Sequence, residues 1–127
     1  MRQQLNISYN PPKKSLGQNF IVDKNFLSKI SNFLVTDAST FIIEVGPGRG
    51  ALTDLIIKKE FRELTLIEKD TVLSKKLELK YQNIDGIKII NDDALLFNYK
   101  YFHQKDNVII VGNLPYNIST QLLFCWL

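Results

Sequence analysis

The chain has 127 residues, of which 45% are hydrophobic and 23% are charged, and it carries a formal net charge of +3. This composition excludes a disordered chain, and the length suffices for one domain with a modest core. No apolar run reaches the roughly 18 residues that a membrane-spanning helix needs. Residues 1–9 lack the pattern of a signal or transit peptide, so we expect a cytoplasmic protein. Cys125 is the only cysteine, and we expect neither a disulfide nor a metal site.

The N-terminal segment is predicted to be an extended basic arm. Pro11 and Pro12 exclude a helix there. Lys13 and Lys14 follow in the same segment, and paired lysines outside a helix are candidates for RNA binding through phosphate contacts. The sequence pI of about 9.0 suits such a polyanionic partner.

From Asp23 onward, helices and strands are predicted to alternate. Asp23 is a candidate N-cap for a helix whose apolar residues share one face, namely Phe26, Leu27, Ile30, Phe33 and Leu34. Short apolar runs predict buried strands at 41–45, 64–67, 87–90 and 108–111, and further helices are expected at 51–59, 71–81 and 120–127. Leu52, Leu55 and Ile56 are expected to face inward. Apolar strands that alternate with helices indicate an α/β protein with a parallel sheet covered on both faces.

Each predicted strand ends in glycine or polar residues, and α/β proteins bind ligands at the carboxyl ends of such strands. Residues 46–50, the glycine loop, allow close approach of a ligand and suit either a dinucleotide or S-adenosylmethionine. Glu68 ends the second strand and is expected to accept both hydroxyls of a ribose, which both cofactors contain. Asp93 or its neighbour Asp92 is expected to accept from the amine of the cofactor's adenine.

The segment that follows the fourth strand predicts the reaction. An adenine amine is a poor nucleophile, so a site that methylates it needs acceptors for the amine hydrogens and a surface for the flipped base. Asn113 offers a side-chain carbonyl and Leu114 a backbone carbonyl. Pro115 stiffens the loop, and Tyr116 offers an aromatic face for stacking. These four residues are the catalytic candidates, and positioning the amine in line with a sulfonium methyl is their expected contribution.

Between about Lys13 and Leu127, the sequence resembles the small-subunit ribosomal RNA adenine N6-dimethyltransferases, the kasugamycin-resistance methyltransferase family. The segments that carry the resemblance are Leu16-Gly17-Gln18-Asn19-Phe20, Glu44-Val45-Gly46-Pro47-Gly48-Arg49-Gly50-Ala51-Leu52-Thr53, Asp93-Ala94-Leu95 and Gly112-Asn113-Leu114-Pro115-Tyr116-Asn117-Ile118-Ser119-Thr120. The resemblance implies a Rossmann-like class I S-adenosylmethionine-dependent methyltransferase that is C-terminally incomplete. It also implies two parts: residues 1–24 are expected to form a basic arm that closes over the cofactor, and residues 25–127 the first part of the catalytic domain.

The resemblance also implies a cofactor and a substrate. The residues expected to bind S-adenosylmethionine are Asn19, Ile21, Gly46, Gly48, Glu68, Asp93 and Asn113. The implied reaction transfers two methyl groups to N6 of each of two adjacent adenosines in the 3′-terminal hairpin loop of small-subunit ribosomal RNA. The implied partner is the immature small ribosomal subunit, and we expect a monomer that does not associate with membranes.

Three alternatives stay open at this point. The erythromycin-resistance methylases share the motifs but act on large-subunit ribosomal RNA. A nicotinamide-dependent oxidoreductase would explain the glycine loop and Glu68, although it leaves residues 113–116 without a role. A truncated module that binds RNA and cofactor without catalysis is the third, because family members are about twice as long; we expect these 127 residues alone to be inactive.

Overall fold

The computed structural model describes residues 23–114, and within this range helices and strands alternate as predicted. The elements are α1 (Lys24–Phe33), β1 (Phe41–Val45), α2 (Ala51–Ile56), β2 (Glu63–Glu68), α3 (Thr71–Tyr81), β3 (Ile87–Asn91), α4 (Lys100–His103) and β4 (Val108–Val111). Several predicted features lie outside the described residues, namely Lys13, Lys14, Asn19, Ile21, Pro115, Tyr116 and the helix expected at 120–127.

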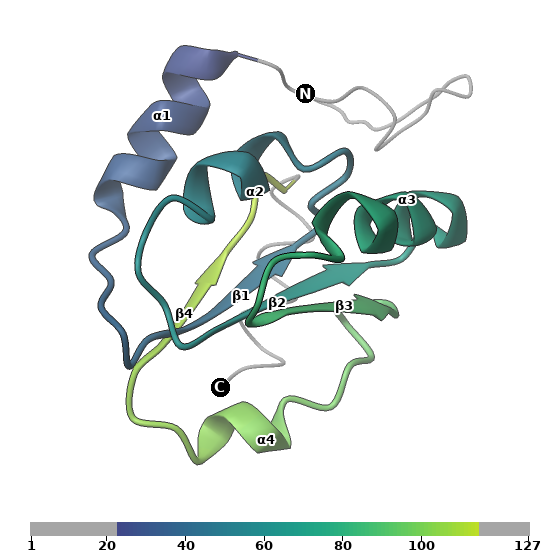
Figure 1. Ribbon diagram of the computed structural model, residues 1–127. Coiled ribbons are helices and arrows are strands. Elements are labelled where there is room, and N and C mark those ends of the chain that lie inside the picture. The colour runs from purple at the N-terminus through teal and green to yellow at the C-terminus, as the bar shows by residue number, and fades with distance from the viewer. Residues whose placement is uncertain (1–22, 115–127) are drawn as a thin grey trace.

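The described strands form one sheet in the order β3-β2-β1-β4, with every neighbouring pair parallel (Figure 1). Glu44 in β1 lies in register with Leu66 of β2 and with Val111 of β4. Because the strands are parallel and in this register, their carboxyl ends meet at one edge of the sheet. The parallel sheet predicted from the apolar runs is therefore confirmed.

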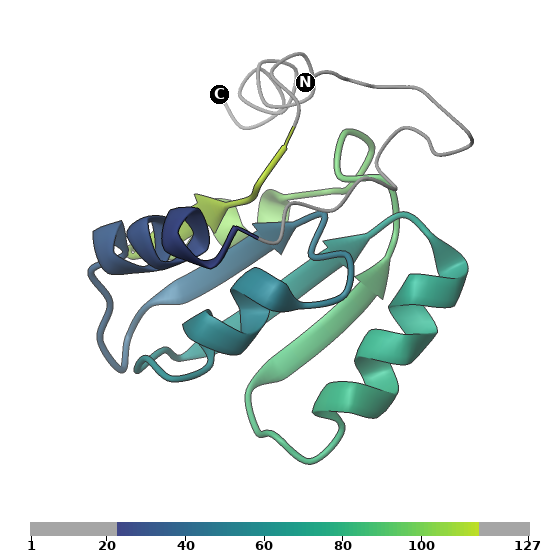
Figure 2. The same cartoon turned by 90° about the horizontal axis from the view of Figure 1, so that it is seen from above.

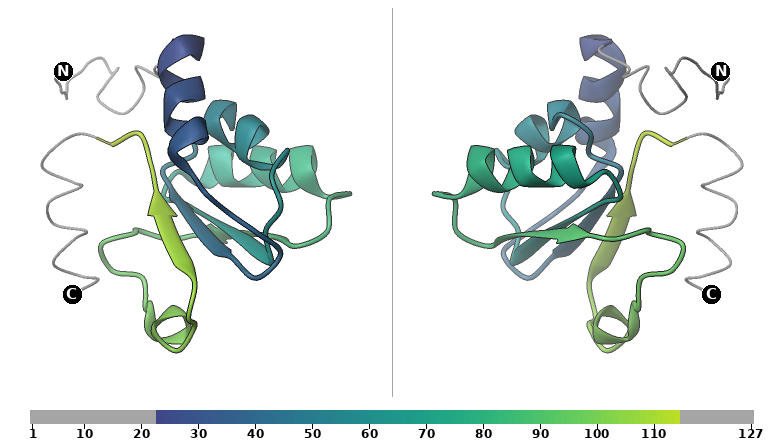
Figure 3. Two further views of the ribbon diagram at one scale, coloured as in Figure 1. Left: turned by 90° about the vertical axis from the view of Figure 1, so that its left-hand side faces the viewer. Right: turned by 90° about the vertical axis from the view of Figure 1, so that its right-hand side faces the viewer.

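Within residues 23–114, different elements cover the two faces of the sheet. Helices α1, α2 and α3 lie side by side on one face (Figure 2), where they enclose a core around Ile42, Leu64 and Leu66. The opposite face carries α4 and the segment before it (Figure 3), and Phe102 packs there with Ile43. The alternation of neighbouring strand residues between two apolar clusters explains why these strands are apolar on both sides.

Helix α1 buries its apolar residues unequally. Its N-terminus is as expected, because the Asp23 carboxylate accepts hydrogen bonds from the amides of Asn25 and Phe26 at 3.0 and 3.2 Å. However, Phe26 and Phe33 are 45% and 84% exposed. The helix packs on the core along a narrow stripe through Leu27. Of the five apolar residues expected to share one face, Leu27 is therefore buried whereas Phe26 and Phe33 are exposed.

Two further differences from the prediction concern the end of α2 and the presence of α4. Helix α2 buries Leu52 and Ile56 as predicted, but it ends at Ile56 because the amide of Lys59 bonds back to the Ile56 carbonyl three residues earlier, at 2.9 Å. Such a bond tightens the last turn and closes the α-helix. The short helix α4 was not predicted, because its four residues are too few to show a helical period.

The buried hydroxyl of Thr65 gives a stability prediction. Thr65 lies in β2, is 2% exposed, and its Oγ1 has no hydrogen-bond partner in the described part of the chain. Thr65→Val keeps the shape and removes this buried polar atom, so we expect the free energy of unfolding to rise by about 1 kcal/mol in urea titrations. Thr53→Val is the matched control and should lower it, because the Thr53 hydroxyl donates to Glu44. A Thr65→Val protein no more stable than wild type would contradict the prediction.

Candidate functional site

The glycine loop connects β1 to α2 at the carboxyl edge of the sheet. Its first amide, on Gly46, donates to the carbonyl of Ile67 at 2.9 Å, which ties the loop to β2. Gly50 is the N-cap of α2 and has a φ of 91°, a left-handed conformation that side chains other than glycine rarely adopt. The sequence therefore requires glycine at this position for a backbone reason that is independent of any ligand.

Glu68, the last residue of β2, reaches the glycine loop. Its Oε1 accepts from the amide of Gly48 at 3.0 Å, and its Oε2 accepts from the amide of Asp70 at 2.9 Å. The residue is 7% exposed, and this burial raises the pKa of its carboxyl above the ordinary value. A carboxylate has about four acceptor positions, so Glu68 retains capacity for further donors after these two bonds.

The end of β3 carries the next group of polar residues. Asn91 Nδ2 donates to the backbone carbonyls of Glu68 and Lys69, at 2.9 and 3.1 Å, and so fixes the chain that leaves β2. Asp93 pairs with Lys69, Nζ to Oδ2 at 3.4 Å, and its Oδ1 accepts from the amide of Leu95 at 2.9 Å. Asp92 Oδ1 accepts from the amide of Asp93 at 2.7 Å. The candidate carboxylates Asp92 and Asp93 are thus the first and second residues after the end of β3.

The end of β4 lies against the glycine loop. A Cβ added at Gly46 would lie 3.1 Å from Leu114 Cδ2, and one added at Gly112 would lie 2.8 Å from the carbonyl oxygen of Val45. Both glycines therefore permit an approach between the ends of β1 and β4 that a larger residue would prevent. This approach brings the backbone of Asn113, between Gly112 and Leu114, next to the loop.

Glu44 is a buried carboxylate that the sequence analysis did not single out. It lies in β1, is 2% exposed, and accepts from Thr53 Oγ1 of α2 at 2.5 Å. The pKa of Glu44 is raised to about 7, chiefly by burial; the Thr53 hydrogen bond lowers it, and the negative charges of Asp54 and Glu68 contribute to the rise. The available signal was a single charged residue inside an otherwise apolar strand.

The predicted site residues within the described range gather at one edge of the sheet. They are Gly46, Gly48, Glu68, Asp93, Asn113 and Leu114. In the same range, no group of histidine, cysteine and acidic side chains is arranged to hold a metal ion. No helix formed by residues 23–114 is long and apolar enough to cross a membrane.

Residues 10–127 match the sequence model of a family described as ribosomal RNA adenine dimethylase. The chain belongs to this family. Its curated relatives include ribosomal RNA small subunit methyltransferase A from Pelagibacter ubique, 43% identical over 116 residues, and the protein of the same name from Maridesulfovibrio salexigens, 42% identical over 112 residues. The alignments cover 91% and 88% of this chain but 42% of each relative, so the chain spans less than half of their length.

Solved structures agree with this fold. The 23S rRNA methyltransferase ErmE superposes with a TM-score of 0.72 at 26% identity, over 84% of this chain and 42% of that chain. A dimethyladenosine transferase from Plasmodium falciparum has a TM-score of 0.65 at 22% identity, over 79% of this chain and 35% of that chain. The class I S-adenosylmethionine-dependent methyltransferase fold predicted from the sequence is confirmed.

The raised pKa of Glu44 predicts a pH-dependent stability. The folded protein binds the Glu44 proton more tightly than the unfolded chain, whose value is near the 4.5 of a free glutamate. The stabilisation is therefore fully present below pH 4.5 and is lost as the pH rises through about 7. Glu44→Gln keeps an acceptor for Thr53 but does not titrate.

Relative to Glu44→Gln, the wild type should lose about 3 kcal/mol of unfolding free energy between low pH and pH 8. Urea titrations of both proteins across this range measure the difference. Parallel pH profiles of the two proteins would contradict the raised pKa.

Proposed function

We propose that this chain carries the cofactor-binding part of an enzyme that dimethylates N6 of two adjacent adenosines in the 3′-terminal hairpin loop of small-subunit ribosomal RNA. The observation that carries the proposal is the packing of Leu114 on Gly46. It brings the end of β4, where the acceptors for an adenine amine are expected, against the loop expected to bind the methyl donor.

The described residues fit S-adenosylmethionine. Glu68 is a buried carboxylate at a strand end with spare acceptor capacity, which suits the two hydroxyls of a ribose. Asp93, or Asp92 beside it, lies at the next strand end and suits the amine of the cofactor's adenine. Gly46 and Gly48 would lie along the cofactor, and Asn19 and Ile21 of the arm would cover it.

The chain's own residues would contribute acceptors and positioning. S-adenosylmethionine supplies the methyl group. The side-chain oxygen of Asn113 and the backbone carbonyl of Leu114 would accept the amine hydrogens, while Tyr116 stacks on the flipped base and Pro115 stiffens the loop. These residues would hold N6 in line with the sulfonium methyl of the bound cofactor, and N6 would release its surplus proton to water after receiving the methyl group.

We assign the small-subunit RNA as substrate because this chain is 43% identical to a small-subunit enzyme and 26% identical to ErmE. Lys13 and Lys14 would contact RNA phosphates from the N-terminal arm. The corresponding cellular setting is a monomer that acts on immature subunits in the cytoplasm. Methylation of large-subunit RNA is the second candidate, and the structural similarity to ErmE, with a TM-score of 0.72, supports it.

The ribose assignment of Glu68 is tested with two ligands. Glu68→Ala should weaken S-adenosylhomocysteine binding by about 2–3 kcal/mol in calorimetry, because a charge-assisted acceptor is lost. Glu68 also holds the amide of Gly48, so the same variant is titrated with the 2′,3′-dideoxy analogue. A ribose contact predicts a much smaller loss with the analogue, whereas equal losses with both ligands would limit Glu68 to holding the loop.

The reaction is tested with the complete protein that carries these residues. It should transfer tritium from labelled S-adenosylmethionine to undermethylated small ribosomal subunits and not to large ones; the reverse result would establish the large-subunit alternative.

Asn113→Ala should abolish transfer and leave RNA binding intact. Tyr116→Ala should lose stacking worth about 1–3 kcal/mol, while Tyr116→Phe keeps most activity. If Tyr116→Phe were as inactive as Tyr116→Ala, the hydroxyl and not the stacking face would be essential.

A further inference from the structure

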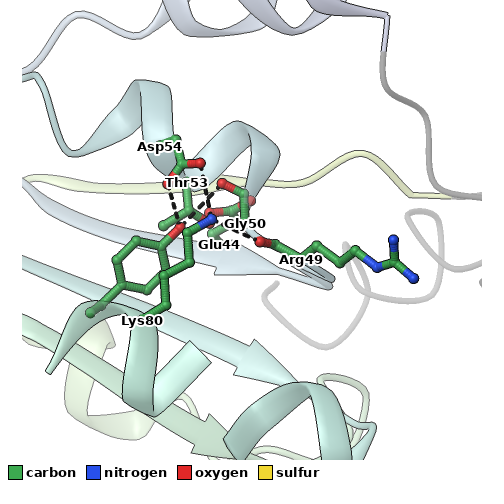
Figure 4. Close-up of polar contacts among 7 residues, drawn as sticks. Glu44, Arg49, Gly50, Thr53, Asp54 and Lys80 are labelled. Atoms are coloured by element: carbon green, nitrogen blue, oxygen red, sulfur yellow. Dashed lines mark hydrogen bonds and ion pairs between the residues drawn. The ribbon is translucent and has the colours of Figure 1, made fainter. Parts of the chain in front are cut away.

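The last turn of α3 contacts the glycine loop, although the two segments are about 30 residues apart in sequence. Lys80 Nζ donates to the carbonyl oxygen of Arg49 at 3.1 Å and to Asp54 Oδ2 at 3.0 Å (Figure 4). Tyr81 Oη donates to Asp54 Oδ1 at 2.7 Å and lies 3.2 Å from the carbonyl oxygen of Gly50. Two consecutive side chains of α3 thus bind the loop and the first turn of α2 together.

Tyr81 is the rigid member of this contact. It is 3% exposed, and its ring packs in the core cluster that contains Leu52 and Leu77. Burial and the neighbouring Asp54 raise the pKa of the Tyr81 hydroxyl above its ordinary value, so the hydroxyl stays protonated and remains a donor. Lys80 is more exposed than Tyr81, and solvent weakens its ion pair with Asp54.

The contact of the Tyr81 hydroxyl with the glycine loop requires glycine at residue 50. A Cβ added at Gly50 would overlap the Tyr81 hydroxyl oxygen. The hydroxyl therefore occupies the space that a side chain at residue 50 would need, in addition to the left-handed φ that already favours glycine there. The close fit between residues 50 and 81 thus involves the hydroxyl of Tyr81 itself.

The peptide groups of the loop are fixed from several directions. The amide of Gly48 donates to Glu68 of β2, and the carbonyl of Arg49 accepts from Lys80 of α3. The carbonyl of Gly50 accepts from the amide of Asp54 and lies next to Tyr81 Oη. A glycine-rich loop has many accessible backbone conformations, so fixing its peptide planes before the ligand arrives lowers the entropic cost of binding.

We propose that Lys80 and Tyr81 are positioning residues for the cofactor, acting through the glycine loop that they hold in its binding conformation. Neither residue needs to touch the cofactor for this role. The inference rests on the proposed function for its ligand, while the ordering of the loop stands on the contacts themselves.

The test uses Tyr81→Phe, which removes the hydroxyl and keeps the ring in the core. Calorimetry with S-adenosylhomocysteine should show binding weakened by about five- to tenfold, as expected for the loss of about one hydrogen bond. Amide hydrogen exchange of residues 46–50 in the free protein should become faster. Lys80→Met keeps the aliphatic stem and should produce a smaller change in the same direction.

Leu77→Val is the matched control, because Leu77 is 1% exposed in the same helix and makes no contact through a polar atom. It should lower the melting temperature without changing the dissociation constant or the exchange of the loop amides. A Tyr81→Phe protein with wild-type affinity and wild-type loop exchange would overturn the positioning role, as would a Leu77→Val protein that lost affinity equally. If the wild type binds neither S-adenosylmethionine nor S-adenosylhomocysteine, the proposed function fails. The ordering of the loop is judged separately by hydrogen exchange, and it fails if the loop amides of Tyr81→Phe exchange at the wild-type rate.

Discussion

The hydrogen bond from the amide of Gly48 to the carboxylate of Glu68 joins the ends of β1 and β2 across 20 residues of sequence. Parallel pairing places the two ends side by side, but only a polar contact of this kind fixes the loop relative to the strand. The same carboxylate also holds the amide of Asp70, which is the N-cap of α3. One side chain therefore sets the starting positions of both the glycine loop and α3, and α3 in turn holds the loop from its other end.

The burial of two carboxylates at one edge of the sheet has an electrostatic consequence. Glu44 and Glu68 lie on neighbouring strands, and the negative charge of Glu68 is one of the causes that raise the pKa of Glu44. Such a region favours an additional positive charge and disfavours an additional negative one. S-adenosylmethionine is a sulfonium cation, whereas a dinucleotide carries a negative pyrophosphate. An ionised Glu68 at this edge would thus favour the cationic methyl donor over the nicotinamide alternative that the glycine loop by itself left open.

The sequence predicted the strands and the polar residues at their ends because both are local features. Apolar runs bounded by glycine or acidic residues identify buried parallel strands, and parallel pairing then brings Gly46, Glu68 and Asn113 to one edge. The sequence did not predict contacts that depend on how helices are placed over the sheet. The approach of Tyr81 to Gly50 and the exposure of Phe33 both follow from where α3 and α1 lie relative to α2, and no periodic pattern within either helix specifies that placement.

The chemistry expected of the site explains why ordering the backbone matters so much here. Once N6 of adenine has formed a bond to the methyl group, the nitrogen carries a positive charge and its proton becomes acidic enough to leave to water. The proposed reaction therefore requires no strong base, and the main contribution of the protein would be to align the amine, the methyl group and the sulfur. Alignment depends on the relative position of the ends of β1 and β4, which Gly46, Gly112 and Leu114 set by direct packing. In the proposed site, a small displacement of the glycine loop would misalign the methyl donor with the acceptor proposed at Asn113. The hydrogen bond that Glu68 accepts from the loop, and those that Lys80 and Tyr81 donate to the loop and to α2, oppose that displacement.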